Sequence, residues 1–337
     1  MDNVRIAGTG SYLPKKVVTN KGLEKMVKNY DYSKYKDFSD WVISVTGIEQ
    51  RHYADENETT EEMGAEASKK VLEDANLKAS DIDLIILNTF TPGTLIPNSA
   101  IEVGHLIGNN NIPAITINQA CSGFVYAVES AYHYIRSGKY NNVLVVASEK
   151  LSSITDYSNP KTAVLFGDGA GAAVLQRSDK KGILGIPYIG GKYSPEHIKV
   201  KNTGVDVKDI LTNAEKEYVK KEYIKMGGGP QVLRQAVNAM VSSAKKVLEE
   251  SELSIEDIDW LCPHQANRRI IDSTAKYLNM PIEKTLITIE EDGNVSGASN
   301  IITLDKSIKQ GKVKRGDKIL MTAVGGGYTM GAFVFEY

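Results

Sequence analysis

Helical patterns of apolar residues alternate along this chain with short apolar runs of strand length. In residues 69–88 a helical pattern ends in a polar turn, and the apolar run Leu84–Leu87 follows it. Thr59 and Glu62 have the spacing of a capping box, which predicts that this helix begins there. The alternation of helices and buried strands predicts an α/β protein built from βαβ units around a mainly parallel sheet.

The chain repeats itself. Residues 245–264 match residues 69–88 at an offset of 176, with nine of twenty positions identical. Two further matches follow in the same order, Ile135–Lys139 with Ile308–Lys312 and Gly171–Val174 with Gly331–Val334. Three matches in one order indicate an internal duplication.

The duplication predicts how the chain is organised. We expect two similar βαβ halves, residues 1–177 and 230–337, that pack as one pseudo-two-fold symmetric body. Residues 178–229 are lysine-rich and lack a regular pattern, so we expect an irregular surface insertion there. The stretch Tyr30–Phe38 is expected to be a second, smaller insertion whose aromatic residues pack at the surface.

Composition restricts the classes of function. Lys and Arg total 40 and Asp and Glu total 42, and this net charge of −2 does not favour a nucleic-acid or membrane partner. The longest apolar runs are far shorter than a membrane span. The chain has only two cysteines, Cys121 and Cys262, so we expect no disulfide framework. Its first residues lack the basic and then apolar pattern of a signal peptide, and we therefore expect a reducing, cytoplasmic location.

The sequence lacks the familiar motifs for metals and nucleotides. Gly8 and Gly10 follow a strand-like segment, but Leu13 stands where a dinucleotide fingerprint needs its third glycine. The five histidines and two cysteines do not form a zinc-type ligand pattern. We therefore expect no bound metal.

Cys121 is the candidate nucleophile. It follows the strand-like run Ile115–Asn118 and precedes Ser122 and Gly123, which open a helix. A thiol at a helix start lies near unpaired N–H groups and the positive end of the helix dipole, and both favour the thiolate. The alternative interpretation is a small buried hydrophobic residue.

Two further polar residues are expected to converge on Cys121. His264 ends the strand of the second repeat where Asn88 ends that of the first, and Asn294 lies within about one position of the site equivalent to Cys121. Reactive groups gather at the carboxyl ends of strands in open α/β sheets. Taken singly, His264 could instead be a buried core histidine, and Asn294 could instead be a turn residue. The segment Gly325–Gly327 allows backbone N–H groups to approach a ligand, so it could form an oxyanion hole with the amide of Cys121.

At these residues the sequence closely resembles the β-ketoacyl-acyl-carrier-protein synthase III family of thiolase-fold condensing enzymes. The resemblance covers nearly the whole chain. It is carried by Gly8–Pro14, Thr46–Ile48 with Arg51 and His52, Ala120–Phe124, Phe166–Gly171, Pro263–Asn267, Gly293–Ser296 and Gly325–Gly327. It implies a layered αβαβα, thiolase-like fold with two duplicated halves, assembled as a homodimer.

The resemblance implies an acyltransferase that needs no cofactor. Cys121 would take an acyl group from acyl-CoA and release CoA. His264 and Asn294 would donate hydrogen bonds to the thioester oxygen of malonyl-acyl carrier protein, whose loss of CO2 gives an enolate that attacks the acyl thioester. The amides of Cys121 and Gly326 would form the oxyanion hole. The product would be 3-oxoacyl-acyl carrier protein, in fatty-acid initiation or a related specialised pathway.

The resemblance also implies contacts with the substrates and the acyl carrier protein. Trp41 would pack against the CoA adenine, and Asn267 would line the pantetheine channel. Ile96 and Val324 stand where bulky phenylalanines often close the acyl pocket, so a primer longer than acetyl is expected. The rim that docks the acidic carrier protein would consist of Gln265, Arg268, Arg269, Arg234 and Lys245.

Some features leave alternatives open. The family usually has an arginine immediately before Thr-Gly-Ile, where this chain has Val45, so the acyl donor can be CoA-bound or carrier-bound. A thiolase is disfavoured because residues 325–337 contain no second cysteine. Acyl transfer to an acceptor other than malonyl, a Cys–His–Asn peptidase and a catalytically silent partner subunit stay as alternatives.

Overall fold

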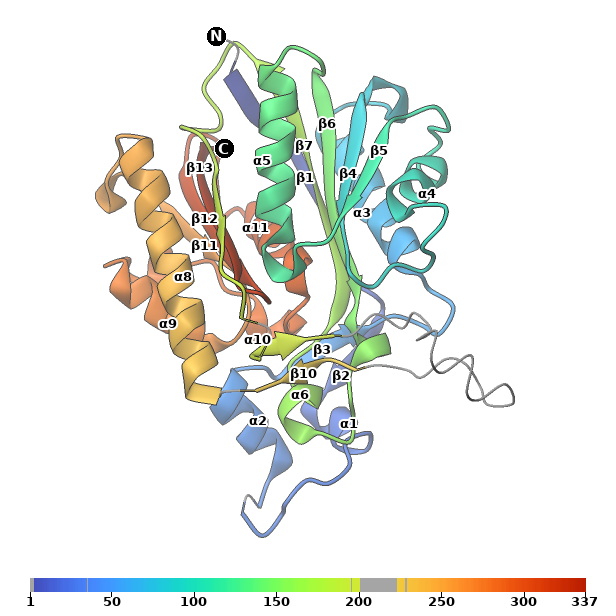
Figure 1. The fold of residues 1–337 in the computed structure, drawn as a ribbon, viewed down its shortest axis with the longest axis vertical. Helices are drawn as coiled ribbons and strands as arrows, with labels where there is room; N and C mark the ends of the chain where they lie inside the picture. The colour runs from blue at the N-terminus through green and yellow to red at the C-terminus, as the bar shows by residue number, and fades with distance from the viewer. Residues whose placement is uncertain (1–2, 35, 195, 201–222, 228) are drawn as a thin grey trace.

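Two β-sheets face each other across a pair of central helices (Figure 1). The computed structural model describes residues 3–34, 36–194, 196–200, 223–227 and 229–337. The central helices are α5 (Gly123–Arg136) and α11 (Ser299–Lys309). The outer face of one sheet is covered by α3 (Thr60–Asp74) and α4 (Ser99–Leu106), and that of the other by α8 (Gly229–Glu250) and α9 (Arg268–Tyr277). The predicted αβαβα layering is confirmed.

The first sheet has five strands in the order β1-β7-β6-β4-β5. Their bounds are β1 (Asn3–Tyr12), β7 (Asp168–Ser178), β6 (Asn142–Lys150), β4 (Leu84–Asn88) and β5 (Ala114–Ile117). β4, β5 and β6 run parallel, whereas β7 runs antiparallel to both of its neighbours. β4 and most of β6 are apolar and fully buried, because helices cover both faces of this sheet.

The second sheet has four strands in the order β11-β12-β13-β8. Their bounds are β11 (Trp260–Pro263), β12 (Lys318–Gly325), β13 (Thr329–Glu336) and β8 (Tyr188–Gly191). β11 and β12 are parallel, and β13 is antiparallel to β12 and to β8. The order and directions of β8-β13-β12-β11 therefore repeat those of β1-β7-β6-β4, as the duplicated sequence predicted.

The expectation of mainly parallel sheets is only partly right. β7 is antiparallel to β6, and β13 is antiparallel to β12. In both cases the connection between the two strands lies at one end of the sheet, so the second strand runs back along the first. The connection from β6 to β7 contains only a short turn at Leu151–Ile154 and the short helix α6 (Pro160–Ala163), and three residues join β12 to β13. Parallel neighbours would need a crossover along the whole length of the sheet.

The expectation of an irregular surface insertion at 178–229 is only partly right for its described part. β8 pairs with β13 and completes the second sheet, and Ile183 is buried in the central core. Two short strands, β9 (Ile198–Lys199) and β10 (Lys225–Met226), pair with each other. Apolar residues interspersed among the lysines make this burial possible. Residues 195, 201–222 and 228 of the predicted insertion lie outside the described residues.

The smaller elements form one end of the molecule (Figure 1). They are α1 (Asn20–Glu24), α2 (Phe38–Thr46), β2 (Lys16–Thr19), β3 (Gln50–Tyr53) and α10 (Ile289–Asp292). Tyr30 and Phe38 pack against Trp41, with ring centroids 5.1 and 5.8 Å from that of Trp41. The predicted aromatic packing is therefore present, although Tyr35 lies outside the described residues.

The start of α3 shows the predicted capping box. Thr59 Oγ1 accepts from the N–H of Glu62, and the Glu62 carboxylate accepts from the N–H of Thr59. No described helix is long and apolar enough to cross a bilayer.

Candidate active site

Cys121 lies in a short 3-10 turn, η2 (Ala120–Ser122), between β5 and α5. The turn begins with Ala120 in the left-handed region, at φ 47°. A Cβ on Gly123 would lie 1.8 Å from Oδ1 of the buried Asn88. Glycine at this position therefore lets α5 start directly against the end of β4, which fixes the turn that carries the thiol.

The second half repeats this turn. η6 (Ser296–Ala298) precedes α11 and begins with Ser296 at φ 50°. The 176-residue offset of the sequence repeat pairs Ala120 with Ser296, and therefore Cys121 with Gly297 and Asn118 with Asn294. The expectation that Asn294 lies within one position of the Cys121 equivalent is wrong, because the true separation is three residues.

The pairing of Asn118 with Asn294 also appears in their contacts. Asn118 Oδ1 accepts from the N–H two residues later at 3.4 Å, and Asn294 Oδ1 accepts from the N–H of Ser296 at 2.8 Å. The Asn294 backbone is held by Leu165 and Gly167, whose contacts are 2.9 and 3.0 Å long. Since its carbonyl oxygen is engaged, the Nδ2 amide of Asn294 is the group that it can offer to a ligand.

His264 follows β11 directly and is 1% exposed. Its backbone N–H donates to Thr322 O at 2.9 Å, which extends the parallel pairing of β11 with β12. Burial lowers the pKa of the imidazole to about 3, so the ring is neutral near pH 7. Nδ1 has no hydrogen-bond partner among the described residues.

The Cys121 thiol accepts a hydrogen bond from the other half of the chain. Ser296 Oγ donates to Sγ at 3.3 Å. Burial raises the pKa of the thiol to about 11, and the charge of Glu149 adds to this increase, whereas the Ser296 contact opposes it. That the helix start favours the thiolate stays a prediction. Desolvation acts on this thiol in the opposite direction, because it favours the neutral form.

One cavity of about 1200 Å³ brings the candidate residues together. Cys121, His264 and Asn294 all line it, and so do Asn267 and the glycines of Gly325–Gly327. Val324 also lines it and is 6% exposed. The three polar groups thus share a solvent-connected chamber, and they come from both halves of the chain.

The segment Gly325–Gly327 approaches the nucleophile closely. A Cβ on Gly325 would lie 3.0 Å from Cys121 N and 2.8 Å from Gln119 O, so only glycine fits without displacing backbone. Ser122 Oγ donates to Thr329 Oγ1 at 2.7 Å, which links η2 to the start of β13. Backbone amides of the two segments are therefore held near one another.

Two expected substrate residues do not face this cavity. Among the described residues that line it, Trp41 and Ile96 are absent. Trp41 is half-buried against Tyr30 and Phe38, and Ile96 is 91% exposed. Asn267 caps α9 through its Oδ1 and donates from Nδ2 to Val45 O at 2.8 Å.

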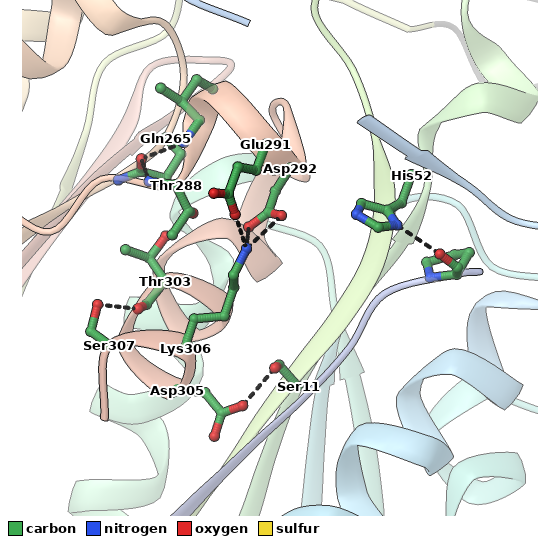
Figure 2. A network of polar contacts seen from close by, with 12 residues as sticks. Ser11, His52, Gln265, Thr288, Glu291, Asp292, Thr303, Asp305, Lys306 and Ser307 are labelled. Carbon is green, nitrogen blue, oxygen red and sulfur yellow. Dashed lines mark hydrogen bonds and ion pairs between the residues drawn. The ribbon is translucent and has the colours of Figure 1, made fainter. Parts of the chain in front are cut away.

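Gln265 is not a docking residue, because its side chain is 1% exposed. Its Oε1 accepts from the N–H groups of Thr288 and Ile289, which holds the start of α10 (Figure 2). In the same region Lys306 of α11 pairs with Glu291 and Asp292, and this contact fixes α10 from its other end (Figure 2). Gln265 thus supports the loop that leads to Asn294.

The other expected docking residues lie at the surface. Arg268 is half-buried and pairs with Asp272 and Glu290, and Arg269 donates to Ser44 O at 2.7 Å. Arg234 and Lys245 are exposed on α8. Among the described residues, the two cations on α8 have no acidic or carbonyl partner, whereas the two on α9 are engaged with neighbouring groups.

Sequence reasoning missed two residues of this site. Ser296 was named only as the end of the segment Gly293–Ser296 in the family resemblance, and its contact with Cys121 depends on the packing of one half on the other. Glu149 carried a signal, because its carboxyl group lies two residues after the buried apolar run Val143–Ala147 of a strand. No described cluster of His, Cys, Asp or Glu could hold a metal ion.

Comparison with known proteins finds relatives along the whole chain. Residues 115–189 match the family model "3-Oxoacyl-[acyl-carrier-protein (ACP)] synthase III", and residues 248–337 match the model of its C-terminal part. Beta-ketoacyl-[acyl-carrier-protein] synthase III of Neisseria gonorrhoeae is 41% identical over 341 residues, with all of both chains covered. The enzyme of the same name from Clostridium acetobutylicum is 39% identical over 337 residues, covering 100% of this chain and 99% of the relative.

Solved structures show the same fold. The crystal structure of 3-oxoacyl-[acyl-carrier-protein] synthase III from Aquifex aeolicus superposes with a TM-score of 0.88 at 40% identity, covering 99% of this chain and 100% of that chain. The priming beta-ketosynthase of the R1128 polyketide biosynthetic pathway superposes with a TM-score of 0.89 at 31% identity, covering 99% and 96%.

Proposed function

The chain belongs to the 3-oxoacyl-[acyl-carrier-protein] synthase III family, and on that premise we propose that Cys121, His264 and Asn294 are its catalytic residues. It is an acyltransferase that condenses an acyl-CoA primer with malonyl-acyl carrier protein, with loss of CO2, at the start of fatty-acid synthesis. The observation that carries the residue assignment is the single cavity onto which all three side chains open. Because the chain belongs to this family, we no longer keep a Cys–His–Asn peptidase as an alternative function.

In the first step Cys121 Sγ attacks the carbonyl carbon of the acyl thioester. The new S–C bond forms as the bond to the CoA sulfur breaks, and the thiol proton ends on the departing CoA. An imidazole whose pKa burial lowers to about 3 is a poor base for a thiol whose pKa is raised, so the proton passes to the sulfur of the departing CoA and we assign His264 to the second step. The Ser296 hydroxyl stabilises the sulfur while it carries negative charge.

In the second step the malonyl group loses CO2 and leaves an enolate on its thioester. The negative oxygen would accept hydrogen bonds from an imidazole N–H of His264 and from Nδ2 of Asn294, both neutral donors in a largely apolar cavity. The enolate carbon attacks the acyl carbonyl on Cys121, the C–C bond forms, and the sulfur leaves as thiolate and regains a proton. The step needs no cofactor.

The oxyanion of each tetrahedral intermediate would bind the amides of Cys121 and Gly326. The close approach of Gly325 to Cys121 N supports this placement. Loss of one such donor raises the barrier by about 3–4 kcal/mol.

The functional unit we propose is a cytoplasmic homodimer. β5 is an edge strand of the first sheet, and its residues are only partly buried. Leu95 and Ile96 in the nearby loop are 76% and 91% exposed, and Leu95 lines the cavity. Pairing of two copies along β5 would cover this edge and bring apolar residues toward the partner's cavity.

Substrate contacts complete the proposal. The primer is longer than acetyl, because Val324 leaves room where a larger side chain would close the cavity, and Ile96 would meet it only across the dimer. Trp41 and Asn267 contact the CoA portion of the acyl donor. Because this chain has Val45 where the family usually has an arginine, an acyl group bound to a carrier protein is the second candidate donor. Arg234, Lys245, Arg268 and Arg269 form the docking surface for the acyl carrier protein.

The proposal is tested by mass spectrometry of the protein after incubation with acyl-CoA thioesters of increasing chain length, followed by malonyl-acyl carrier protein. The expected result is an acyl adduct on Cys121, then its loss with release of CO2 and formation of 3-oxoacyl-acyl carrier protein. An adduct that malonyl-acyl carrier protein never discharges would indicate transfer to another acceptor. Absence of an adduct at Cys121 with every donor would refute the catalytic assignment.

A further inference from the structure

Asn88 is a buried polar residue that the steps described above do not use. It is the last residue of β4 and is 0% exposed. The offset of 176 residues makes it the counterpart of His264, which follows β11 directly. His264 lines the catalytic cavity, whereas the side chain of Asn88 contacts the turn η2 that carries Cys121. The two halves of the chain therefore use the same position in different ways.

The side-chain amide of Asn88 binds the backbone of the two residues directly before Cys121. Gln119 N donates to Asn88 Oδ1 at 3.1 Å, and Asn88 Nδ2 donates to Ala120 O at 3.3 Å. Because a backbone N–H only donates and a backbone carbonyl only accepts, these partners fix the orientation of the amide. One carboxamide thus serves a donor and an acceptor at once, which a carboxylate or an aliphatic side chain could not do.

The bond to Ala120 O acts on the amide of the nucleophile. Ala120 O and Cys121 N belong to one peptide unit, which is planar, so its C=O and its N–H point in opposite directions. At the other end of this unit, Cys121 N lies 3.0 Å from the place that a Cβ on Gly325 would take, and Gly325 lines the cavity. Asn88 therefore fixes the direction of the N–H that we assign to the oxyanion hole.

The same contacts support a turn with a strained residue. Ala120 is in the left-handed region, at φ 47°, where the Cβ of an L-residue approaches the following carbonyl oxygen. A residue keeps such a conformation only when the surrounding structure holds it. Asn88 holds Ala120 from its own half of the chain, and Thr329 Oγ1 of the other half donates to Gln119 O at 3.2 Å.

Two glycines make room for the Asn88 side chain. A Cβ on Gly123 would lie 1.8 Å from Asn88 Oδ1, and a Cβ on Gly297 would lie 2.6 Å from Asn88 Nδ2. Gly297 is the counterpart of Cys121 in the second half. The carboxamide thus lies between the equivalent turns of both halves, and a side chain on either glycine would displace it.

We propose that Asn88 is a positioning residue for the oxyanion hole, which orients the Cys121 amide by binding the two residues before it. The inference rests on the proposed function, because it assumes that an oxyanion forms beside this amide. Its consequence is selective. Loss of Asn88 should slow reactions of Cys121 that pass through a tetrahedral oxyanion, and should affect much less a direct displacement by the same sulfur.

The test compares two kinds of reaction at Cys121 by peptide mass spectrometry. Acylation by octanoyl-CoA or by p-nitrophenyl octanoate passes through a tetrahedral oxyanion. Alkylation by iodoacetamide does not, because the sulfur displaces iodide from a CH2 group. The ratio of the acylation rate to the alkylation rate therefore reports on the oxyanion hole, and a general loss of folded protein leaves it unchanged.

Three full-length variants separate the contacts of Asn88. N88A removes both hydrogen bonds, whereas N88D keeps an acceptor for Gln119 N and replaces the donor to Ala120 O by an oxygen. G297A leaves Asn88 in the chain and is expected to displace its amide from the other half. N20A is the matched control, because Asn20 is also a buried asparagine with side-chain hydrogen bonds and does not line the cavity.

For N88A and N88D we expect acylation by both donors to fall at least about tenfold, while alkylation stays within about threefold of wild type. Wild-type acylation in either variant, an equal loss of both kinds of reaction, or the same selective loss in N20A would overturn the inference. If neither Asn88 variant folds, the same comparison for G297A decides. Should octanoyl-CoA fail to acylate wild type, the proposed function fails, and the activated ester still tests Asn88.

Discussion

Ser296 and Cys121 are 175 residues apart in the chain, and the hydroxyl of the first donates a hydrogen bond to the sulfur of the second at 3.3 Å. Each lies in a 3-10 turn that begins in the left-handed region and opens a central helix. The nucleophile of one half is therefore supported by the equivalent turn of the other half. The active site exists only where the two halves meet.

Removal of this donor should make the thiol harder to ionise. A hydrogen bond to the thiolate favours the charged form, so S296A is expected to raise the pKa of Cys121 by about one to two units, which corresponds to the roughly 1.5–3 kcal/mol of a bond to a charged group. The measurement is the pH dependence of alkylation at Cys121. S307A, which removes a hydroxyl on α11 that does not contact Cys121, is the control. A midpoint that moves to lower pH in S296A would contradict the prediction.

The side-chain amide of Asn294 should accelerate decarboxylation of malonyl-acyl carrier protein and have little effect on the rate at which Cys121 is acylated. N294A is expected to keep formation of the acyl adduct on Cys121 and to lower decarboxylation of malonyl-acyl carrier protein by about 10²–10³-fold, as for loss of a preorganised donor. N294D should be at least as impaired, since it replaces the donor by a charge that repels the enolate. Release of CO2 and adduct mass are measured on the same samples. Equal loss of both half-reactions would show that Asn294 only holds the turn.

The glycines beside the nucleophile should differ in their tolerance of a side chain. A Cβ on Gly325 meets backbone and Thr329 Oγ1 at 2.6 Å, whereas a Cβ on Gly326 meets its nearest neighbour at 3.5 Å. G325A is therefore expected to lower the free energy of unfolding by about 1–3 kcal/mol, and G326A by much less. Denaturant unfolding of both variants checks this. Equal destabilisation would mean that the segment can move away from Cys121.

The buried His264 should make stability depend on pH. Its pKa is about 3 in the folded protein and near 6.5 when unfolded, so the unfolded state binds more protons between these values. Stability therefore falls as pH decreases from 6.5 toward 3, by about 2 kcal/mol between pH 7 and pH 5 from this group. H264Q should lose that part of the dependence. An identical pH dependence in H264Q and wild type would show that the imidazole is not buried in the neutral form.

Val324 should set the length of the primer. It lines the cavity at the end of β12, so V324F is expected to lower acylation of Cys121 by octanoyl-CoA about tenfold relative to acetyl-CoA, since a Phe ring would occupy space that the chain needs. The ratio of the two adducts in competition is the measurement, with the melting temperature as the check on folding. A wild-type protein that strongly prefers acetyl-CoA would refute the longer primer.

The sequence alone determined the repeated architecture and the identity of the reactive side chains. Helical and strand periodicities are local properties, so the order of elements and the capping box of α3 followed directly from the residue pattern. The duplication placed His264 opposite Asn88, because an offset of 176 residues is a property of the chain itself. Cys121 and Gly325–Gly327 were recognisable for the same reason.

Only the tertiary structure decided how these residues act. The protonation of Cys121 and His264 depends on how completely the two halves exclude water, since burial raises the pKa of the first and lowers that of the second. The burial of Gln265 and the exposure of Ile96 likewise depend on how distant segments of the chain pack. No local pattern specifies such contacts, since desolvation and packing are properties of the assembled interior.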